Sequence, residues 1–185
     1  MSTLSTAAWA AHEVGLATTI GGTIFGQMGL DPAIQEISSP AERDRVQTSA
    51  WRRFSYVNLA AHGVMAATWF AGRTMLSGNE VSKDARTLTK VKDGLVIASL
   101  VTGLTCNVFG RLLGRRTDAG LGPNELADRA GGEDEADKTH KLQRFVSATG
   151  TLNLIANIAV LGVTTMLAMQ ASESGRFPLW SRRLP

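Results

Sequence analysis

Eight side chains that could bind a proton, an ion or a polar ligand stand inside otherwise apolar stretches of this chain. They are His12, Glu13, Asn58, His62, Asn107, Arg111, Asn153 and Asn157. Apart from the adjacent His12 and Glu13, they form pairs four residues apart, and a helix places both members of such a pair on one face. Three helices would therefore each present a polar strip.

Two hypotheses explain these strips. In the first, they meet and form an internal site for a polar substrate, an ion or a proton, because ionisable groups inside a membrane are costly and usually functional. In the second, they are hydrogen-bonded contacts between helices, worth roughly 0.6 to 2 kcal/mol each. The sequence alone leaves both open.

The histidines His12 and His62 also suggest a b-type haem with two axial imidazoles. Their predicted depths, about 6 Å below one surface and about 12 Å below the other, leave them roughly 12 Å apart along the normal of a core about 30 Å thick. Axial ligands should lie at similar depth. We therefore expect no cofactor, with a haem or quinone held through these two histidines as the less favoured alternative.

The elements that carry these side chains are four stretches without Asp, Glu, Lys or Arg. They are residues 14–30, 54–72, 94–110 and 145–172. Spanning a hydrocarbon core takes about 17 to 25 residues. The sequence predicts an all-α integral membrane four-helix bundle, a single domain over 1–185, with helices at about 8–30, 54–76, 94–114 and 145–171.

A soluble four-helix bundle is the competing fold class. The overall composition would allow it, with 44% apolar residues, 19% charged residues and a mean hydropathy of +0.01. Soluble helices, however, need a charged face, and Val146 to Met169 has no charge on any face. A chain of 185 residues cannot enclose four such helices, so we favour the membrane.

The connections are predicted to be short except for a charged loop over 115–144. Within it, Gly131 and Gly132 predict a turn, followed by a helix from about Glu133 into the last apolar stretch. Aromatic residues of the kind that anchor membrane interfaces lie near the predicted helix ends. They are Trp9, Trp51, Tyr56, Trp69 and Trp180.

Small residues at four-residue spacing predict close helix packing, since helices in lipid pair through such residues. The sets are Gly22 with Gly26, Gly63 with Ala67 and Ala71, and Gly110 with Gly114.

Loop charges suggest an orientation. The loops after the first and third helices carry eleven Lys and Arg, against eight on the other side, where Lys92 is counted. The positive-inside rule then places the termini on the non-cytoplasmic side. We expect no cleaved signal and a location in the bacterial inner (plasma) membrane.

Membrane lipids are the first expected partners, because the net charge of +3 suits anionic lipid. No nucleic-acid motif accompanies that charge, and we expect no nucleic-acid partner. The lone Cys106 excludes an intramolecular disulfide.

No motif of a metalloprotease, phosphate loop, redox CxxC or serine hydrolase occurs in the sequence. We therefore expect a non-catalytic membrane subunit or scaffold that associates with itself or with other membrane subunits. The alternative is a small transporter or ligand binder that uses the polar strips.

Two segments also resemble a known family. They are LTCNVFGRLLGRRTD with the following GLG, and KLQRFVSATGTLNLIANI. In order and spacing, they are similar to the small four-helix membrane proteins related to transmembrane protein 205, which include the bacterial domain of unknown function 4149. The resemblance implies the same fold and no assigned reaction.

The resemblance carries over to five positions of this chain. They are Asn107, Arg116, Thr117, Gly150 and Asn153. This chain departs from the family pattern at Arg115, where a proline is expected, and at Thr149, where a histidine is expected.

Overall fold

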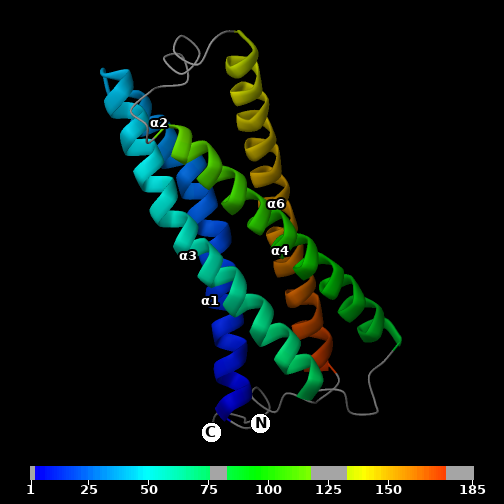
Figure 1. The fold of residues 1–185 in the computed structure, drawn as a ribbon. Helices are drawn as coiled ribbons and strands as arrows, with labels where there is room; N and C mark the ends of the chain where they lie inside the picture. The colour runs from blue at the N-terminus through cyan, green and yellow to red at the C-terminus, as the bar shows by residue number, and fades with distance from the viewer. Residues whose placement is uncertain (1–2, 76–82, 118–132, 174–185) are drawn as a thin grey trace, which may run out of the picture.

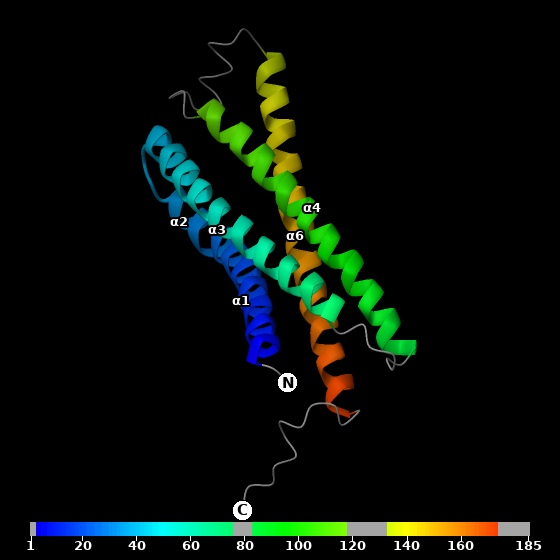
Figure 2. The same ribbon diagram turned by 60° about the horizontal axis from the view of Figure 1, so that its bottom comes forward.

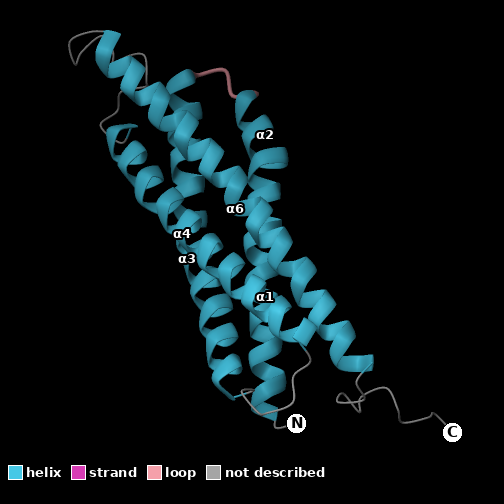
Figure 3. Ribbon diagram, turned by 90° about the vertical axis from the view of Figure 1, so that its right-hand side faces the viewer, coloured by secondary structure: helices cyan, strands magenta, loops and turns pink. Residues whose placement is uncertain are grey.

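The structure is a computed structural model that describes residues 3–75, 83–117 and 133–173. Every regular element in these residues is helical, which confirms the all-α class there. The four long helices are α1 (Thr3–Phe25), α3 (Pro40–Met75), α4 (Lys83–Thr117) and α6 (Glu133–Glu173). A π-helical turn, η1 (Gly26–Leu30), and the short α2 (Asp31–Gln35) join α1 to the loop before α3 (Figure 3).

The helix starting at Glu133 is confirmed, but three predicted boundaries are wrong. α3 begins at Pro40 rather than near 54, α4 begins at Lys83 rather than near 94, and α4 ends at Thr117 rather than near 114. Charged residues show where a segment is exposed to water, but they do not interrupt the backbone hydrogen bonds of a helix. A charge-free stretch is therefore shorter than the helix that contains it. The predicted turn at Gly131 and Gly132 lies outside the described residues.

Local sequence explains the early start of α3. Ser39 precedes Pro40, and the Ser39 hydroxyl accepts a hydrogen bond from the Glu42 backbone N–H at 3.4 Å. Proline is favoured at the first helical position because its missing N–H would be unsatisfied there in any case. A serine cap followed three residues later by glutamate is a typical helix start.

The long helices are arranged as two pairs. α1 lies along α3, and α4 lies along α6 (Figures 1 and 2). The pairs meet mainly where α3 packs against α4, with a smaller contact between α1 and α6. The starts of α1 and α4 and the ends of α3 and α6 lie toward the same end of the molecule, at the bottom of Figure 1.

Many polar residues point inward and many apolar residues point outward. Leu16, Met65, Val96 and Val160 form a small buried core. The buried polar residues of the described chain outnumber its buried hydrophobic ones. They are His12, Thr19, Thr23, Asn58, His62, Lys92, Ser99, Asn107, Thr149, Asn153, Asn157 and Thr164.

Two segments of the described chain are long and apolar enough to cross a membrane, Arg86–Leu112 in α4 and Arg144–Gln170 in α6. Only 22% of the most apolar window of each is buried within the chain. Most of the apolar surface of both helices therefore faces outward.

The predicted small-residue contacts differ between helices. The Phe54 ring lies against Gly22 and the Trp51 ring against Gly26, so this set does bring α1 close to α3. A Cβ placed at Gly63 or Gly110 meets no atom within 4 Å, and Ala67 is exposed. The close packing predicted for these three residues is therefore not made in the described part of the chain. Gly114 lies near the end of α4.

The closest helix approach is at Gly15, where a Cβ would lie 2.8 Å from the Ala61 carbonyl oxygen of α3. We expect Gly15→Ala to lower the unfolding free energy by about 1 to 3 kcal/mol, because overpacking forces the helices apart. Thermal unfolding of the purified protein measures the effect. Gly21→Ala on the same helix is the matched control, because its Cβ meets no atom within 4 Å. Equal melting temperatures for the two variants would contradict the close contact.

Candidate functional sites in the helix interior

The polar residues predicted from the sequence do not meet in one site. His62, Asn153 and Asn157 lie in one hydrogen-bonded network, with Asn58 and Asn107 at its border. His12 and Glu13 lie elsewhere, on α1, with partners that include α3 and α4. Arg111 is exposed, with its guanidinium 4.7 Å from the centre of the Tyr56 ring. The predicted polar residues therefore lie in two separate clusters and one surface contact.

The first cluster joins α3, α4 and α6, and we call its members the Asn153 network. They are His62, Ser99, Thr102, Asn153 and Asn157. The Ser99 hydroxyl donates to Asn157 Oδ1 at 2.8 Å, and Asn157 Nδ2 donates to the backbone oxygen and Oδ1 of Asn153 at 2.9 and 3.1 Å.

The amide of Asn153 makes the contacts between helices. Its Nδ2 reaches the Ser99 backbone oxygen at 2.8 Å and Thr102 Oγ1 at 2.9 Å, with His62 Nε2 at 3.3 Å. The other ring nitrogen, His62 Nδ1, donates to the Asn58 backbone oxygen at 2.8 Å. Both nitrogens of His62 thus have partners inside the protein. This supports the interhelical-contact hypothesis for this part of the interior.

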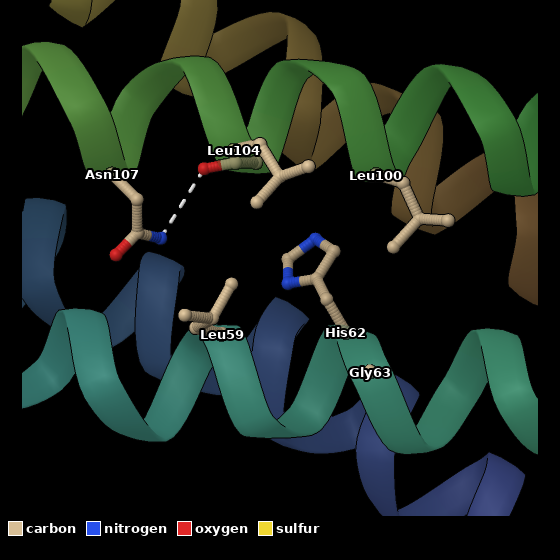
Figure 4. A pocket seen from close by; sticks show the side chains of 7 residues that line it. Leu59, His62, Gly63, Leu100, Leu104 and Asn107 are labelled. Atoms are coloured by element: carbon tan, nitrogen blue, oxygen red, sulfur yellow. Dashed lines mark hydrogen bonds between the residues drawn. The ribbon is translucent and has the colours of Figure 1, made fainter.

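A cleft of about 200 Å³ borders this network between α3 and α4 (Figure 4). Its lining residues are Leu59, His62, Gly63, Leu100, Gly103, Leu104 and Asn107. Asn107 Nδ2 donates to the Gly103 backbone oxygen at 3.2 Å, while Asn107 Oδ1 has no hydrogen-bond partner. The cleft is therefore apolar with one available acceptor at its edge.

The second cluster contains a residue that the sequence analysis missed. Lys92 of α4 is 0% exposed, and its Nζ has no hydrogen-bond partner. The ammonium lies 4.0 Å from the centre of the Trp69 ring and 5.5 Å from that of Trp9. Lys92 stands two residues before a charge-free stretch, and this position in the sequence is typical of a loop charge. No pattern in the sequence distinguishes it from one, because the helix start at Lys83 is not marked by the charge-free stretch.

His12 and Glu13 complete this cluster from α1. His12 is 2% exposed, and its Nδ1 lies 2.8 Å from the Met65 backbone oxygen, to which it donates. Its ring lies between those of Trp9 and Trp69, with centroid distances of 6.3 and 6.1 Å. Neither His12 Nε2 nor Glu13 Oε1 has a hydrogen-bond partner. We call Trp9, His12, Glu13, Trp69 and Lys92 the Lys92 cluster.

Two tryptophans of α3 are fixed by carboxylates from neighbouring elements. Trp51 Nε1 donates to Asp31 Oδ1 of α2 at 2.9 Å, and Trp69 Nε1 donates to Asp93 Oδ1 of α4 at 3.0 Å. Trp51 and Trp69 are therefore hydrogen-bonded to different elements, 18 residues apart along α3.

The two histidines of the haem hypothesis face different surroundings. His12 lies beside the rings of Trp9 and Trp69. His62 Nε2 instead faces Gly103, where a Cβ would lie 2.9 Å away, and it is within hydrogen-bond distance of Asn153 Nδ2. Haem or quinone binding through these residues stays a prediction. In the described part of the chain, no three His, Cys, Asp or Glu side chains come together as a metal site requires.

Comparisons with protein-family models, curated proteins and solved structures find no match to this chain. The resemblance to the family related to transmembrane protein 205 therefore stays a prediction.

The Asn153 network should contribute to stability. We expect Asn153→Ala to lower the unfolding free energy by about 1 to 3 kcal/mol, because it leaves the buried His62 Nε2 without a donor and removes the hydrogen bond to the Ser99 backbone oxygen. Thr151→Ala is the matched control, since Thr151 is exposed on the same helix and bonds only within it. Thermal unfolding measures both. A network without structural importance would give two variants of equal stability.

Proposed function

We propose that this chain is an integral membrane protein whose four long helices form a bundle across the bilayer. The observation that carries the proposal is the distribution of side chains, with amides, hydroxyls and imidazoles buried and large apolar residues exposed. Ile155, for example, is 58% exposed and Val101 is 57% exposed, both in segments long enough to cross a membrane. Outward-facing apolar surface of this extent is costly in water and favourable in lipid.

The spacing of the two Trp–Asp pairs supports the same proposal. Trp51 and Trp69 are about 27 Å apart along α3, at about 1.5 Å per residue. The hydrocarbon core of a bilayer is about 30 Å thick, and tryptophan is enriched at its two interfaces.

Within the membrane, we propose a non-catalytic role as a subunit or scaffold that associates with a second copy of itself. Gly63 and Ala67 leave the α3 backbone uncovered on the outside of the chain, as helix association in lipid favours. For orientation, Lys92 is buried and does not belong with the loop charges, which widens the predicted excess of positive charge on the cytoplasmic side.

The membrane proposal is tested by a charge on the outer surface. Ile155→Asp should sharply reduce the amount of protein recovered in membranes, because aspartate at the centre of a spanning helix costs about 2.5 to 3.5 kcal/mol. Ala41→Asp, exposed in the first turn of α3 and outside the predicted spans, is the matched control. Fractionation after expression measures both. A soluble protein would tolerate Ile155→Asp as well as Ala41→Asp.

Association is tested by native mass spectrometry of the detergent-solubilised protein, which should show dimers or larger assemblies. Gly63→Ile should shift the population toward monomers, because a Cβ at Gly63 meets no atom of its own chain within 4 Å and the added side chain would occupy the face offered to the second copy. Gly21→Ile, equally open on α1, should leave the assembly intact. Monomers alone in the wild-type spectrum would rule out self-association.

A second candidate function is a small transporter or ligand binder with a polar site between its helices, near the membrane interface at which Trp69 is proposed to lie. The observation that favours it is the Lys92 cluster, where Lys92 Nζ, His12 Nε2 and Glu13 Oε1 are buried without hydrogen-bond partners. A cluster of purely structural contacts would satisfy these atoms, as the Asn153 network does.

A further inference from the structure

The buried ammonium of Lys92 lacks the partner that a buried charge needs. Two indole faces stabilise it, and a cation over an aromatic ring gains about 0.5 to 2 kcal/mol. That gain is smaller than the several kcal/mol that an ion loses when it leaves water. A lysine in this position is stable if a nearby group balances its charge or takes its proton.

Two proton acceptors from α1 belong to the same cluster. Glu13 Oε1 is buried and has no donor. His12 donates through Nδ1 to the Met65 backbone oxygen, so its Nε2 carries a lone pair, and this atom also has no donor. The Trp69 ring joins the two helices, since its centre lies 6.1 Å from that of the His12 ring and 4.0 Å from Lys92 Nζ, and Glu13 follows His12 directly in α1. One buried proton donor and two unsatisfied proton acceptors thus belong to one cluster.

The other elements supply few competing groups. Asp93 of α4 accepts from Trp69 Nε1 and is engaged. From Phe54 to Gly72, the ionisable side chains of α3 are Tyr56 and His62, and His62 belongs to the Asn153 network. α6 has none from Phe145 to Gln170. Among the helix segments described above, the ionisable groups left for proton exchange in the Lys92 cluster are His12, Glu13 and Lys92.

We propose that the Lys92 cluster is a proton-binding site in the helix interior. In the loaded site one proton is shared between Lys92 and Glu13, either as ammonium with carboxylate or as neutral amine with neutral carboxylic acid. Release of this proton to water leaves the neutral amine and the carboxylate, and uptake of one proton from water restores the loaded site. The inference rests on the second candidate function and names the proton as the species that the site binds.

The position of the cluster makes it accessible to protons from one side. Lys92 is about 14 Å from the start of α4, and His12 is about 14 Å from the start of α1, at about 1.5 Å per residue. Both starts lie at the same end of the molecule (Figure 1). Exchange with water is therefore expected at this end, and the Asn153 network lies deeper along α4 and α6.

Tryptophan fluorescence reports directly on this site, because the Lys92 ammonium lies 4.0 Å from the Trp69 ring centre. In detergent, the emission of the wild-type protein should show a one-proton transition between about pH 5 and pH 11, the range in which histidine and lysine titrate. Lys92→Met should abolish it, and Glu13→Gln should shift its midpoint. Lys90→Met, exposed on the same helix, should leave the transition unchanged.

Circular dichroism and gel filtration establish that each variant is folded. Infrared difference spectra give a second readout that does not depend on Lys92→Met folding, since a protonated carboxyl band should appear in the wild type and be lost in Glu13→Gln. The proposal is overturned by a wild-type emission that does not titrate, by a transition that survives in Lys92→Met, or by an unshifted midpoint in Glu13→Gln. If the cluster titrates but the protein moves no solute across vesicle membranes, the transporter function is ruled out and the proton-binding site is not.

Discussion

Polar side chains that water cannot reach must find partners within the protein, and this requirement determines how the four long helices face one another. Asn153 shows the effect most clearly, because its one amide contacts Ser99 and Thr102 of α4 and lies beside His62 of α3. A rotation of α6 by one residue would turn this amide away from these partners and expose it to the outside. Hydrogen bonding of this kind has direction, whereas apolar packing in lipid has little. The network therefore fixes the rotation of α6.

The two interior clusters show that burial alone does not indicate function. Asn157 is as deeply buried as Lys92, yet both polar atoms of its amide have partners from Ser99 and Asn153. Lys92 is surrounded by indole rings that accept no conventional hydrogen bond, and the neighbouring His12 and Glu13 each keep an unpaired atom. A satisfied network costs little to maintain. An unsatisfied charge is retained at an energetic cost, which is why the Lys92 cluster is the stronger functional candidate.

The sequence predicted the all-α class and the helix start at Glu133, and four-residue spacing correctly placed Asn153 and Asn157 side by side. It could not predict which strips would meet, because spacing defines a face of one helix but not the face of its neighbour. The same gap explains why Gly22 contacts Phe54 while Gly63 faces outward. Lys92 was missed because a charge near the edge of an apolar stretch looks like a loop residue until the helix that precedes it is known.

The register of α3 connects the packing to the Lys92 cluster. Asp31 and Asp93 each hold an indole of α3, about 27 Å apart, so α3 cannot slide along its neighbours without breaking a hydrogen bond at one end or the other. The indole of Trp69 has two roles in this arrangement, since its N–H binds Asp93 while its face covers the Lys92 ammonium. Because Asp93 follows Lys92 directly, the hydrogen bond that fixes α3 also brings this ring over the lysine. The same contact that sets the helix register thus encloses the buried charge.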